Sequence, residues 1–576
     1  MSSSSFGTGT TKGLYLQWEG KRVYRQRIPK PRLLEPVPEL SVKGGEPEHM
    51  LIEGDNLQVL ASLKSRYAGA IDVIYIDPPY NLGKDDFLYS DKRFQDPDAE
   101  DAEGVYVTNE DAGRHTMWLN FMAPRLFMLS EMLHSSRGVI FVSINDVELF
   151  RLGMLMNEIF GEDNWVGTIV WHGSRDNNPT RIATEHEYLL CYAKNRDNLP
   201  SAWRGRVSEA KDALLAEYER LKNQGLPLDQ LRLSYREFVR ENKEQLGELV
   251  HYSRIDELGP YTGMRAVHNP GKEGYRYDVR HPKTKQPCRI PARGYRFPPE
   301  RMKEMLKARP CPILFGKDHT QIITLKAYLK DYTPSLRSVI SDIAARTGAN
   351  TLNDLFGSRE LFRNPKPVEL IERLLDFTSR KESVVLDAFA GSGTTGEAVL
   401  RLNASDGGSR RFILIEEGRG KNGRDRFTRT LTAPRLKKVI AKYRYPAGFT
   451  FYTTGRRLDR KAIVNLERDA LANLICLSDE TGRGRSVTRL PGHTYVIGKN
   501  PRNEAICLVW EGEDRSEVTN EHLKQASAEV ASLGLKKPFR IYGTFCRIAD
   551  SSSWKFCQIP DEILAQMQLD EERAEV

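Results

Sequence analysis

Residues 384–396 read Val-Val-Leu-Asp-Ala-Phe-Ala-Gly-Ser-Gly-Thr-Thr-Gly. The apolar run at the start of this stretch ends in Asp387 and passes into a loop that contains Gly391 and Gly393. A helix is expected from about residue 395 to 402. A buried strand, a glycine loop and a helix in this order are typical of a cofactor site, because glycine lets the backbone turn sharply and approach a ligand closely.

The residues after the loop favour a ligand that carries a ribose rather than a phosphate. Gly396 is followed by Glu397, so the lysine that holds phosphate in a nucleotide loop is missing. Residues 412–415 are a second apolar run, and Glu416 follows it at the spacing of an acid that accepts ribose hydroxyls. S-adenosylmethionine has a ribose and no phosphate. Taken alone, the loop also fits a purely structural turn.

A further apolar run lies much earlier in the chain, at residues 73–76, and is followed by Asp77-Pro78-Pro79-Tyr80. Two prolines fix the backbone and remove two hydrogen-bond donors, so the carbonyl groups of this loop are free to face a ligand. Asp77 and the Pro78 carbonyl can accept both hydrogens of an exocyclic base amine, and Tyr80 can stack on the base. We therefore predict that Asp77, Pro78, Pro79 and Tyr80 form a catalytic loop; the alternative is a rigid turn.

This arrangement suits methyl transfer to adenine N6. The N6 lone pair is delocalised into the ring, and two acceptors would draw the nitrogen toward tetrahedral geometry and free the lone pair for in-line attack on a sulfonium methyl group. Such catalysis consists mainly of positioning and electrostatics. A base inside a duplex cannot reach the loop, so we expect it to be flipped out.

Strand and helix patterns alternate over residues 49–200 and again after 341, which predicts an α/β fold. The expected architecture is a Rossmann-like methyltransferase sheet, split by an inserted target-recognition domain and followed by a small α+β domain. The expected parts are an N-terminal arm (1–48), a catalytic half (49–200), a target-recognition insert with a helical segment (201–340), a cofactor half (341–445) and a C-terminal domain (446–576).

The insert is the candidate DNA reader. Between residues 251 and 337 lysine and arginine outnumber acidic residues, and aromatic residues are interleaved with them. Such a composition suits contact with DNA phosphates and some base readout, although a solvated basic face is the alternative for any one residue. The candidate nucleic-acid contacts are Arg276, Arg280, Lys283, Lys285, Arg289, Arg293 and Arg296.

Residues 77–80 and 389–393 resemble the two hallmark loops of the amino-methyltransferase family of DNA methyltransferases, and their order along the chain resembles the β class. The resemblance implies contacts of Asp55 and Asn56 with the cofactor adenine and of Lys366 with the cofactor methionine end; a turn residue and a solvated charge are the alternatives. The implied cofactor-binding residues are Asp55, Asn56, Lys366, Asp387, Phe389, Gly391, Gly393, Thr394 and Glu416.

The phrases Trp-Glu-Gly-Lys at 18–21, Gly-Tyr-Arg at 294–296 and Lys-Ala-Tyr-Leu at 326–329 are similar to the modification subunit of type III restriction systems. This resemblance implies duplex DNA as substrate, a homodimer, and an ATP-dependent translocase-nuclease as a separate restriction subunit. Cytosine-N4 methylation, RNA or protein-amide methylation, and a catalytically idle DNA-binding subunit are the other readings.

Bulk properties agree with this interpretation. The 576 residues carry a net charge of +8, which suggests a polyanionic partner. Seven cysteines without a CxxC pair predict neither a disulfide framework nor a metal site. No apolar run approaches the length of a membrane helix, and the first residues lack a signal-peptide pattern, so a cytoplasmic protein is expected.

Overall fold

The structure is a computed structural model, and it describes residues 16–99, 104–173, 181–203, 205, 209–225, 227–269, 271–359, 361–417, 427–479 and 487–567. Parts of the predicted N-terminal arm (1–15) and C-terminal domain (480–486 and 568–576) therefore lie outside the described residues. The chain divides into two compact units, which we call the main unit (Met1–Ser201 with Arg337–Val576) and the insert unit (Ala202–Leu336).

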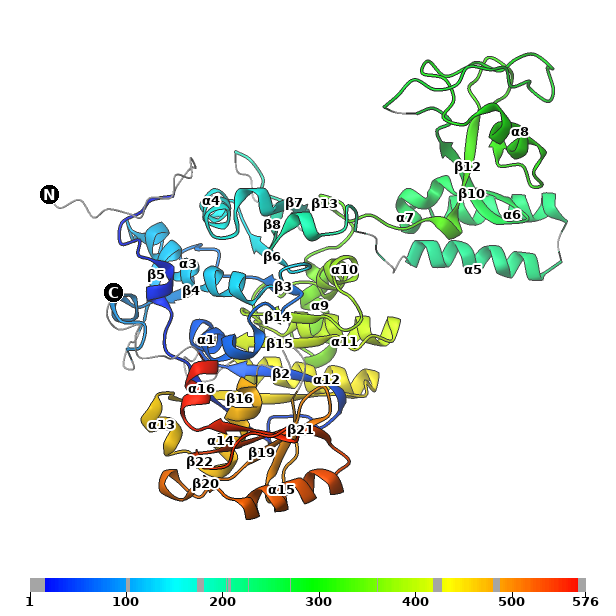
Figure 1. The fold of residues 1–576 in the computed structure, drawn as a ribbon. Helices are drawn as coiled ribbons and strands as arrows, with labels where there is room; N and C mark the ends of the chain where they lie inside the picture. The colour runs from blue at the N-terminus through cyan, green and yellow to red at the C-terminus, as the bar shows by residue number, and fades with distance from the viewer. Residues whose placement is uncertain are drawn as a thin grey trace. The chain divides into compact units, whose positions relative to one another are not determined.

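The main unit is built on a ten-stranded sheet with the strand order β1-β16-β2-β15-β14-β3-β6-β8-β7-β13 (Figure 1). Neighbouring strands from β16 to β6 run parallel, whereas β1 and β8 run antiparallel to their neighbours. In sheet order the strands are β1 (Arg32–Pro36), β16 (Ala447–Arg457), β2 (Gly45–Glu53), β15 (Arg411–Glu416), β14 (Val384–Asp387), β3 (Val73–Ile76), β6 (Val139–Ile144), β8 (Glu187–Ala193), β7 (Trp165–Trp171) and β13 (Val339–Ile340).

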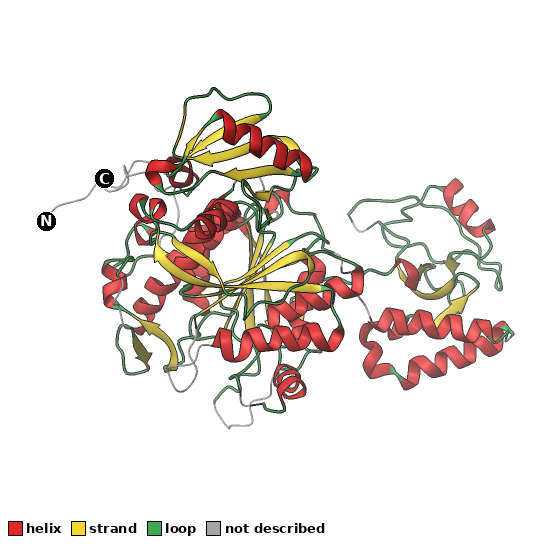
Figure 2. Ribbon diagram, turned by 90° about the horizontal axis from the view of Figure 1, so that it is seen from below, coloured by secondary structure: helices red, strands yellow, loops and turns green. Residues whose placement is uncertain are grey.

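Helices cover both faces of this sheet (Figure 2). Strands β3 and β6 are buried along their whole length, which explains why their sequences are continuous apolar runs rather than alternating ones. The helices in this part of the main unit are α1 (Asn56–Tyr67), α2 (Asp91–Gln95), α3 (Arg114–Met132), α4 (Leu149–Phe160), α9 (Arg346–Phe356), α10 (Val368–Thr378), α11 (Thr394–Asp406) and α12 (Ala433–Tyr443). A short hairpin, β4 (Lys84–Tyr89) with β5 (Val105–Thr108), precedes α3.

The two halves of the sheet meet where β14 pairs with β3. Val385 lies opposite Val73 and Leu386 opposite Ile74, so two segments that are far apart in the chain hydrogen-bond side by side. The predicted α/β fold class, a Rossmann-like sheet split by an insert, is confirmed. The pairing also brings the two loops singled out in the sequence to neighbouring strands.

The predicted N-terminal arm, residues 1–48, contains a strand at the edge of the sheet, which the sequence did not predict. Residues 32–36 form β1, which pairs antiparallel with β16, and β16 in turn lies parallel to β2. Leu33 and Leu34 of β1 are only 2% and 3% exposed. Two adjacent leucines in a proline-rich, basic segment give no period-two pattern, so the sequence does not reveal this strand.

The C-terminal part has a smaller mixed sheet with helices on both faces, an α+β arrangement as predicted. Its strands, in sheet order, are β17 (Thr488–Arg489), β18 (Val496–Lys499), β19 (Glu504–Leu508), β21 (Lys536–Gly543) and β23 (Trp554–Gln558). One face packs against α14 (Arg468–Ser478) and α16 (Asp561–Gln566), and the other against α15 (Asn520–Ser532). Smaller elements are α13 (Arg460–Val464), β20 (Glu517–Val518) and β22 (Phe545–Cys546).

The insert unit combines a helical part with a four-stranded sheet in the order β11-β12-β10-β9. Its elements are α5 (Glu209–Asn223), α6 (Leu228–Glu241), α7 (Lys243–Leu246), β9 (Arg254–Asp256), β10 (Gly259–Arg265), α8 (Pro299–Lys307), β11 (Ile313–Leu314) and β12 (Thr324–Tyr328). Leu214, Leu231 and Tyr235 form the core between α5 and α6. Across both units, the described helices include none that is long and apolar enough to span a membrane.

Candidate active site

The residues predicted to bind and react follow the carboxyl ends of adjacent parallel strands. Asp77 follows β3, Asp387 ends β14, Glu416 ends β15, and Asp55 comes two residues after the end of β2. Because parallel strands end at the same edge of a sheet, their loops meet there, and this edge is where open α/β sheets bind ligands. The site is therefore assembled from the middle of the sheet.

The catalytic loop is held by contacts on both sides. The Tyr80 hydroxyl donates to Asp77 Oδ1 at 2.9 Å, and the Trp118 indole N–H donates to the Pro79 carbonyl at 2.7 Å. The Pro78 carbonyl accepts no hydrogen bond from any residue that the structure describes, so it is free to accept one from a ligand. Burial and the Asp77 charge raise the pKa of Tyr80 well above its ordinary value, which keeps the hydroxyl protonated.

Lys366 bridges the two predicted loops. Its ammonium lies 2.9 Å from Asp77 Oδ2, and its backbone carbonyl accepts a hydrogen bond from the Thr394 hydroxyl at 3.3 Å. The side chain is 9% exposed and also lies 5.0 Å from the centre of the Tyr80 ring. The ammonium thus contacts the catalytic loop, and its contact with the cofactor methionine end stays a prediction from the family resemblance.

Glu187, which the sequence analysis did not select, belongs to the same cluster. Its Oε2 lies 3.0 Å from the Tyr80 hydroxyl and 3.2 Å from the Lys366 ammonium. Glu187 is the first residue of β8, which runs antiparallel to β6, so it lies at the edge where the parallel strands end. Residue spacing does not mark Glu187, because the direction of the strand that it begins is known only once the strand order is known.

A buried carboxylate fixes the turn after Tyr80. Asn81 has a positive φ of 58° and is fully buried, and its amide donates to Glu148 Oε1 at 2.6 Å. Glu148 is itself 0% exposed and also contacts His115 Nδ1. Asparagine tolerates this left-handed conformation better than most residues, and its amide gives one oxygen of the buried Glu148 carboxylate a hydrogen-bond donor.

The glycine loop folds back onto the acids around it. Gly391 and Gly393 have φ values of 49° and 84°, and the Gly391 N–H donates to Glu416 Oε2 at 2.6 Å. The Asp387 carboxyl accepts hydrogen bonds from the Phe389 N–H at 3.0 Å and from the Thr395 hydroxyl at 2.5 Å. Burial, reinforced by neighbouring acids, raises the pKa of Asp387 to about 7 despite these hydrogen bonds.

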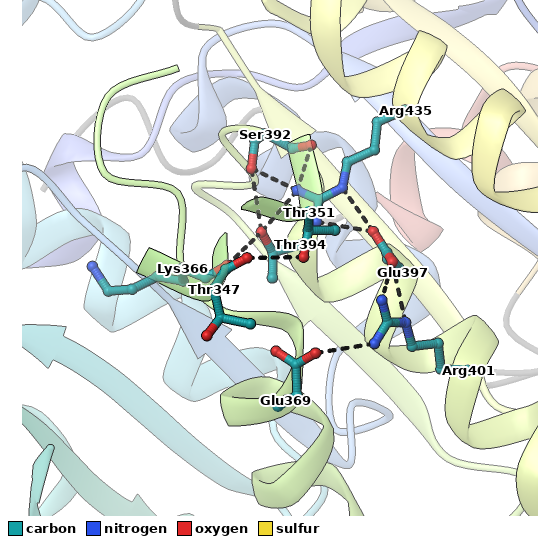
Figure 3. A network of polar contacts seen from close by, with 9 residues as sticks. All are labelled: Thr347, Thr351, Lys366, Glu369, Ser392, Thr394, Glu397, Arg401 and Arg435. Carbon is teal, nitrogen blue, oxygen red and sulfur yellow. Dashed lines mark hydrogen bonds and ion pairs between the residues drawn. The ribbon is translucent and has the colours of Figure 1, made fainter. Parts of the chain in front are cut away.

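A buried network of ion pairs and hydrogen bonds holds Ser392 and Thr394 of the glycine loop (Figure 3). Arg435 of α12 is fully buried and donates to the Ser392 hydroxyl at 2.8 Å and to the Thr394 hydroxyl at 3.0 Å. It also pairs with Glu397 at 2.9 Å, and Arg401 joins Glu397 to Glu369 of α10. No local motif marks Arg435, because its partners lie on other elements.

The predicted adenine contacts are anchored by Arg125. Asp55 caps α1 by accepting the Gln58 N–H at 3.0 Å, and it pairs with Arg125 at 2.9 Å. Asn56 accepts from Arg125 Nε at 2.5 Å and donates to the Ala388 carbonyl at 3.0 Å, which ties α1 to the glycine loop. A cleft of about 260 Å³ opens here; its lining residues are Arg32, Glu53, Gly54, Asp55, Gln58, Arg93, Ala99, Glu417, Thr453 and Thr454.

The predicted DNA contacts lie together in the insert unit. Residues 275–295 form an irregular hairpin, with Tyr275 bridged to Tyr295 and Arg280 to Pro287. We call this segment the basic hairpin. Val279 and Cys288 are buried on one side of it. Arg276, Arg280, Lys283, Lys285, Arg289 and Arg293 are exposed, and Arg296, just beyond the hairpin, is half-buried beside Phe297.

An Asp-Pro-Pro-Tyr loop and a glycine loop that follow neighbouring parallel strands are the arrangement expected for the class of amino-methyltransferases. The model of the DNA methylase family matches residues 71–420, more than half of the chain. The chain therefore belongs to the N6/N4 DNA methylase family.

Relatives within this family agree with the assignment. The chain is 42% identical to the EcoP15I Mod subunit of a type III restriction-modification enzyme from Escherichia coli, over 64% of this chain and 58% of that protein. It is 30% identical to the StyLTI Mod subunit from Salmonella typhimurium, over 75% of this chain and 64% of that protein. It is also 30% identical to the type II methyltransferase M.KpnI from Klebsiella pneumoniae, over 63% of this chain and 79% of that protein. The chain spans less than two thirds of both Mod subunits.

Proposed function

We propose that this chain transfers a methyl group from S-adenosylmethionine to adenine N6 in duplex DNA, as the modification subunit of a type III restriction-modification system. The observation that carries the proposal is the position of Asp77 and Tyr80 beside the glycine loop, because the two loops follow the paired strands β3 and β14. Membership of the DNA methylase family and the similarity to Mod subunits support it.

The residues around the glycine loop fit S-adenosylmethionine. Glu416 lies against the loop, and Glu417 and Asp55 line the neighbouring cleft. Carboxylates accept hydrogen bonds from ribose hydroxyls but repel phosphate, so the acids favour a ligand with a ribose and no phosphate. Asp387, Phe389, Gly391, Gly393 and Thr394 would shape the loop around it, with Asp55, Asn56 and Lys366 at its ends. The bound cofactor would supply an electrophilic methyl group.

The catalytic loop would hold the target amine. Asp77 and the free Pro78 carbonyl would accept its two hydrogens, and the Tyr80 ring would stack on the flipped base. Pro79, whose carbonyl is bonded to Trp118, keeps the loop rigid. Acceptors fixed on a rigid loop need little reorganisation when positive charge develops on the nitrogen, which is the principal source of catalysis in such a site.

Adenine is the preferred base, because an acid at the first position of the loop leans toward adenine in this family. Cytosine N4 would fit the same acceptors and is the second candidate. A catalytically idle DNA-binding subunit is a weaker alternative, since both loops are intact.

The wider assembly follows from the same proposal. Residues 201–340 would recognise the DNA target, with the basic hairpin and Arg296 as its phosphate and base contacts. Residues 49–200 and 341–445 would form the two halves of the methyltransferase domain, and 1–48 and 446–576 the flanking parts. We further propose a homodimer that pairs with an ATP-dependent restriction subunit, which sedimentation of the chain alone and with that subunit would test.

Product analysis tests the proposed reaction. The protein is incubated with labelled S-adenosylmethionine and plasmid DNA from a host without DNA methyltransferases, and the DNA is then digested to nucleosides. We expect the label in N6-methyladenine. Label in N4-methylcytosine would correct the base, and an absence of label with and without the restriction subunit would overturn the proposed function.

A further inference from the structure

Both oxygens of the Asp77 carboxylate already have donors. Oδ1 accepts the Tyr80 hydroxyl at 2.9 Å, and Oδ2 lies 2.9 Å from the Lys366 ammonium. In the proposed function, however, Asp77 must accept a hydrogen from the target amine. Each donor occupies one acceptor site on its oxygen, and the Lys366 charge weakens the carboxylate as an acceptor most strongly because its side chain is only 9% exposed and little screened by water.

Glu187 offers an acceptor to both of these donors at once. Its Oε2 lies 3.0 Å from the Tyr80 hydroxyl and 3.2 Å from the Lys366 ammonium. A tyrosine hydroxyl has a single hydrogen, so Tyr80 can donate to Asp77 or to Glu187 but not to both. The Lys366 ammonium has three hydrogens and can divide them between the two acids. Small rotations would therefore move both donors from one carboxylate to the other.

Glu187 is also placed to act without moving its backbone. It begins β8 and pairs with Trp171 of β7, and the rest of β8 pairs with β6. Its side chain is 33% exposed, similar to the 27% of Asp77. The site thus contains two carboxylates and one ammonium around a neutral tyrosine. Without Glu187, Lys366 would pair with Asp77 alone and neutralise the acceptor that the amine needs.

We propose that Glu187 is a positioning residue that takes over the Tyr80 hydroxyl and the Lys366 ammonium when the target amine donates to Asp77. It acts through these two side chains and does not contact the amine itself. The inference rests on the proposed methyltransferase function and adds to it a second acid that keeps the first one available. No bond is made or broken by Glu187.

The variant that tests this is Glu187→Gln, which keeps the shape of the side chain and removes its charge. Glu185→Gln is the matched control, because Glu185 lies two residues earlier and pairs with His172 at 3.4 Å, outside the cluster. Methyl transfer to unmethylated plasmid DNA is measured in single turnovers at saturating cofactor. We expect Glu187→Gln to slow transfer about 10- to 100-fold, with cofactor and DNA dissociation constants within about twofold of wild type.

Two further variants separate positioning from folding. Glu187→Asp keeps the charge and should recover most of the rate. Tyr80→Phe removes one of the two donors, so the loss in the Glu187→Gln/Tyr80→Phe double variant should be smaller than the product of the single losses. The thermal unfolding midpoint of each variant is measured alongside.

The inference is overturned if Glu187→Gln transfers methyl at the wild-type rate, if Glu185→Gln slows transfer equally, or if the double variant shows the full product of both losses. It is also overturned if Glu187→Asp is as slow as Glu187→Gln, since packing alone would then explain the effect. A wild-type protein that transfers no methyl to DNA would instead overturn the proposed function from which the inference starts.

Discussion

Asp387 is a residue whose protonation the fold changes. It ends β14 with 2% of its surface exposed, and burial raises its pKa from the ordinary 3.8 to about 7. The folded protein therefore holds this proton up to about pH 7, whereas the unfolded chain releases it near pH 4. Between these values the unfolded state binds fewer protons, so the free energy of unfolding falls as the pH rises.

Replacing Asp387 by asparagine should remove that pH dependence. Urea unfolding at pH 4.5, 5.5, 6.5 and 7.5 gives the slope for each protein. We expect the wild type to lose stability more steeply than Asp387→Asn by up to about 1.4 kcal/mol per pH unit, the value for one proton. Parallel slopes for the two proteins would show that Asp387 is ionised throughout this range.

The sequence yields a candidate role for a residue only where a motif carries it. Asp77 and Tyr80 stand in one short loop, so the order of residues in that loop is enough to infer their chemistry. Glu187 and Arg435 act through partners on other strands and helices. Their importance depends on strand order and helix packing, which residue spacing along the chain does not contain.

The glycine loop permits a prediction at the level of elements. Gly393 has a φ of 84°, and an added Cβ would lie 2.9 Å from the Thr432 methyl group. Gly407, at the end of α11, has a φ of 65° with no heavy atom within 4 Å of such a Cβ. Alanine at either position should cost about 1–2 kcal/mol for the left-handed backbone, but only Gly393→Ala should also displace the loop.

Calorimetric titration with S-adenosylmethionine separates the two effects. We expect Gly393→Ala to raise the cofactor dissociation constant at least about tenfold, which is about 1.4 kcal/mol. Gly407→Ala should bind the cofactor like wild type and serve as the control for backbone strain. Equal affinities of the two variants would indicate that the loop does not contact the cofactor.

The basic hairpin is the second element with a testable role. Lys283 and Lys285 are exposed near its tip, and the buried Val279 and Cys288 hold its other side. If both lysines contact phosphates, the Lys283→Gln/Lys285→Gln variant should bind duplex DNA more weakly whatever its sequence. The slope of log affinity against log salt should fall by about 1.8, or 0.9 for each phosphate contact.

A lysine outside the hairpin provides the comparison for this experiment. Lys222 is an exposed residue of α5 that pairs with Glu219, and Lys222→Gln removes the same charge without altering the hairpin. Fluorescence anisotropy with a labelled duplex measures both variants over a range of salt concentrations. An unchanged salt slope in the double lysine variant would exclude the hairpin tip as a phosphate contact.

For the whole molecule, the sequence predicts the α/β core and the insertion but not how the sheet ends. The core strands are continuous apolar runs joined to recognisable loops, so their identity is local information. Strand β1 depends on pairing with β16, which lies more than four hundred residues later. Only the folded chain supplies that partner, and propensity alone cannot reveal it.

The central claim concerns one carboxylate, and methyl transfer by an Asp77 variant tests it most directly. The single-turnover rate of label transfer from S-adenosylmethionine to unmethylated plasmid DNA is compared for wild type and Asp77→Ala, with the cofactor affinity of each measured separately. Our account predicts labelled N6-methyladenine from wild type and a rate at least about 100-fold lower for Asp77→Ala, at similar cofactor affinity. An Asp77→Ala protein that methylates DNA at the wild-type rate would contradict it.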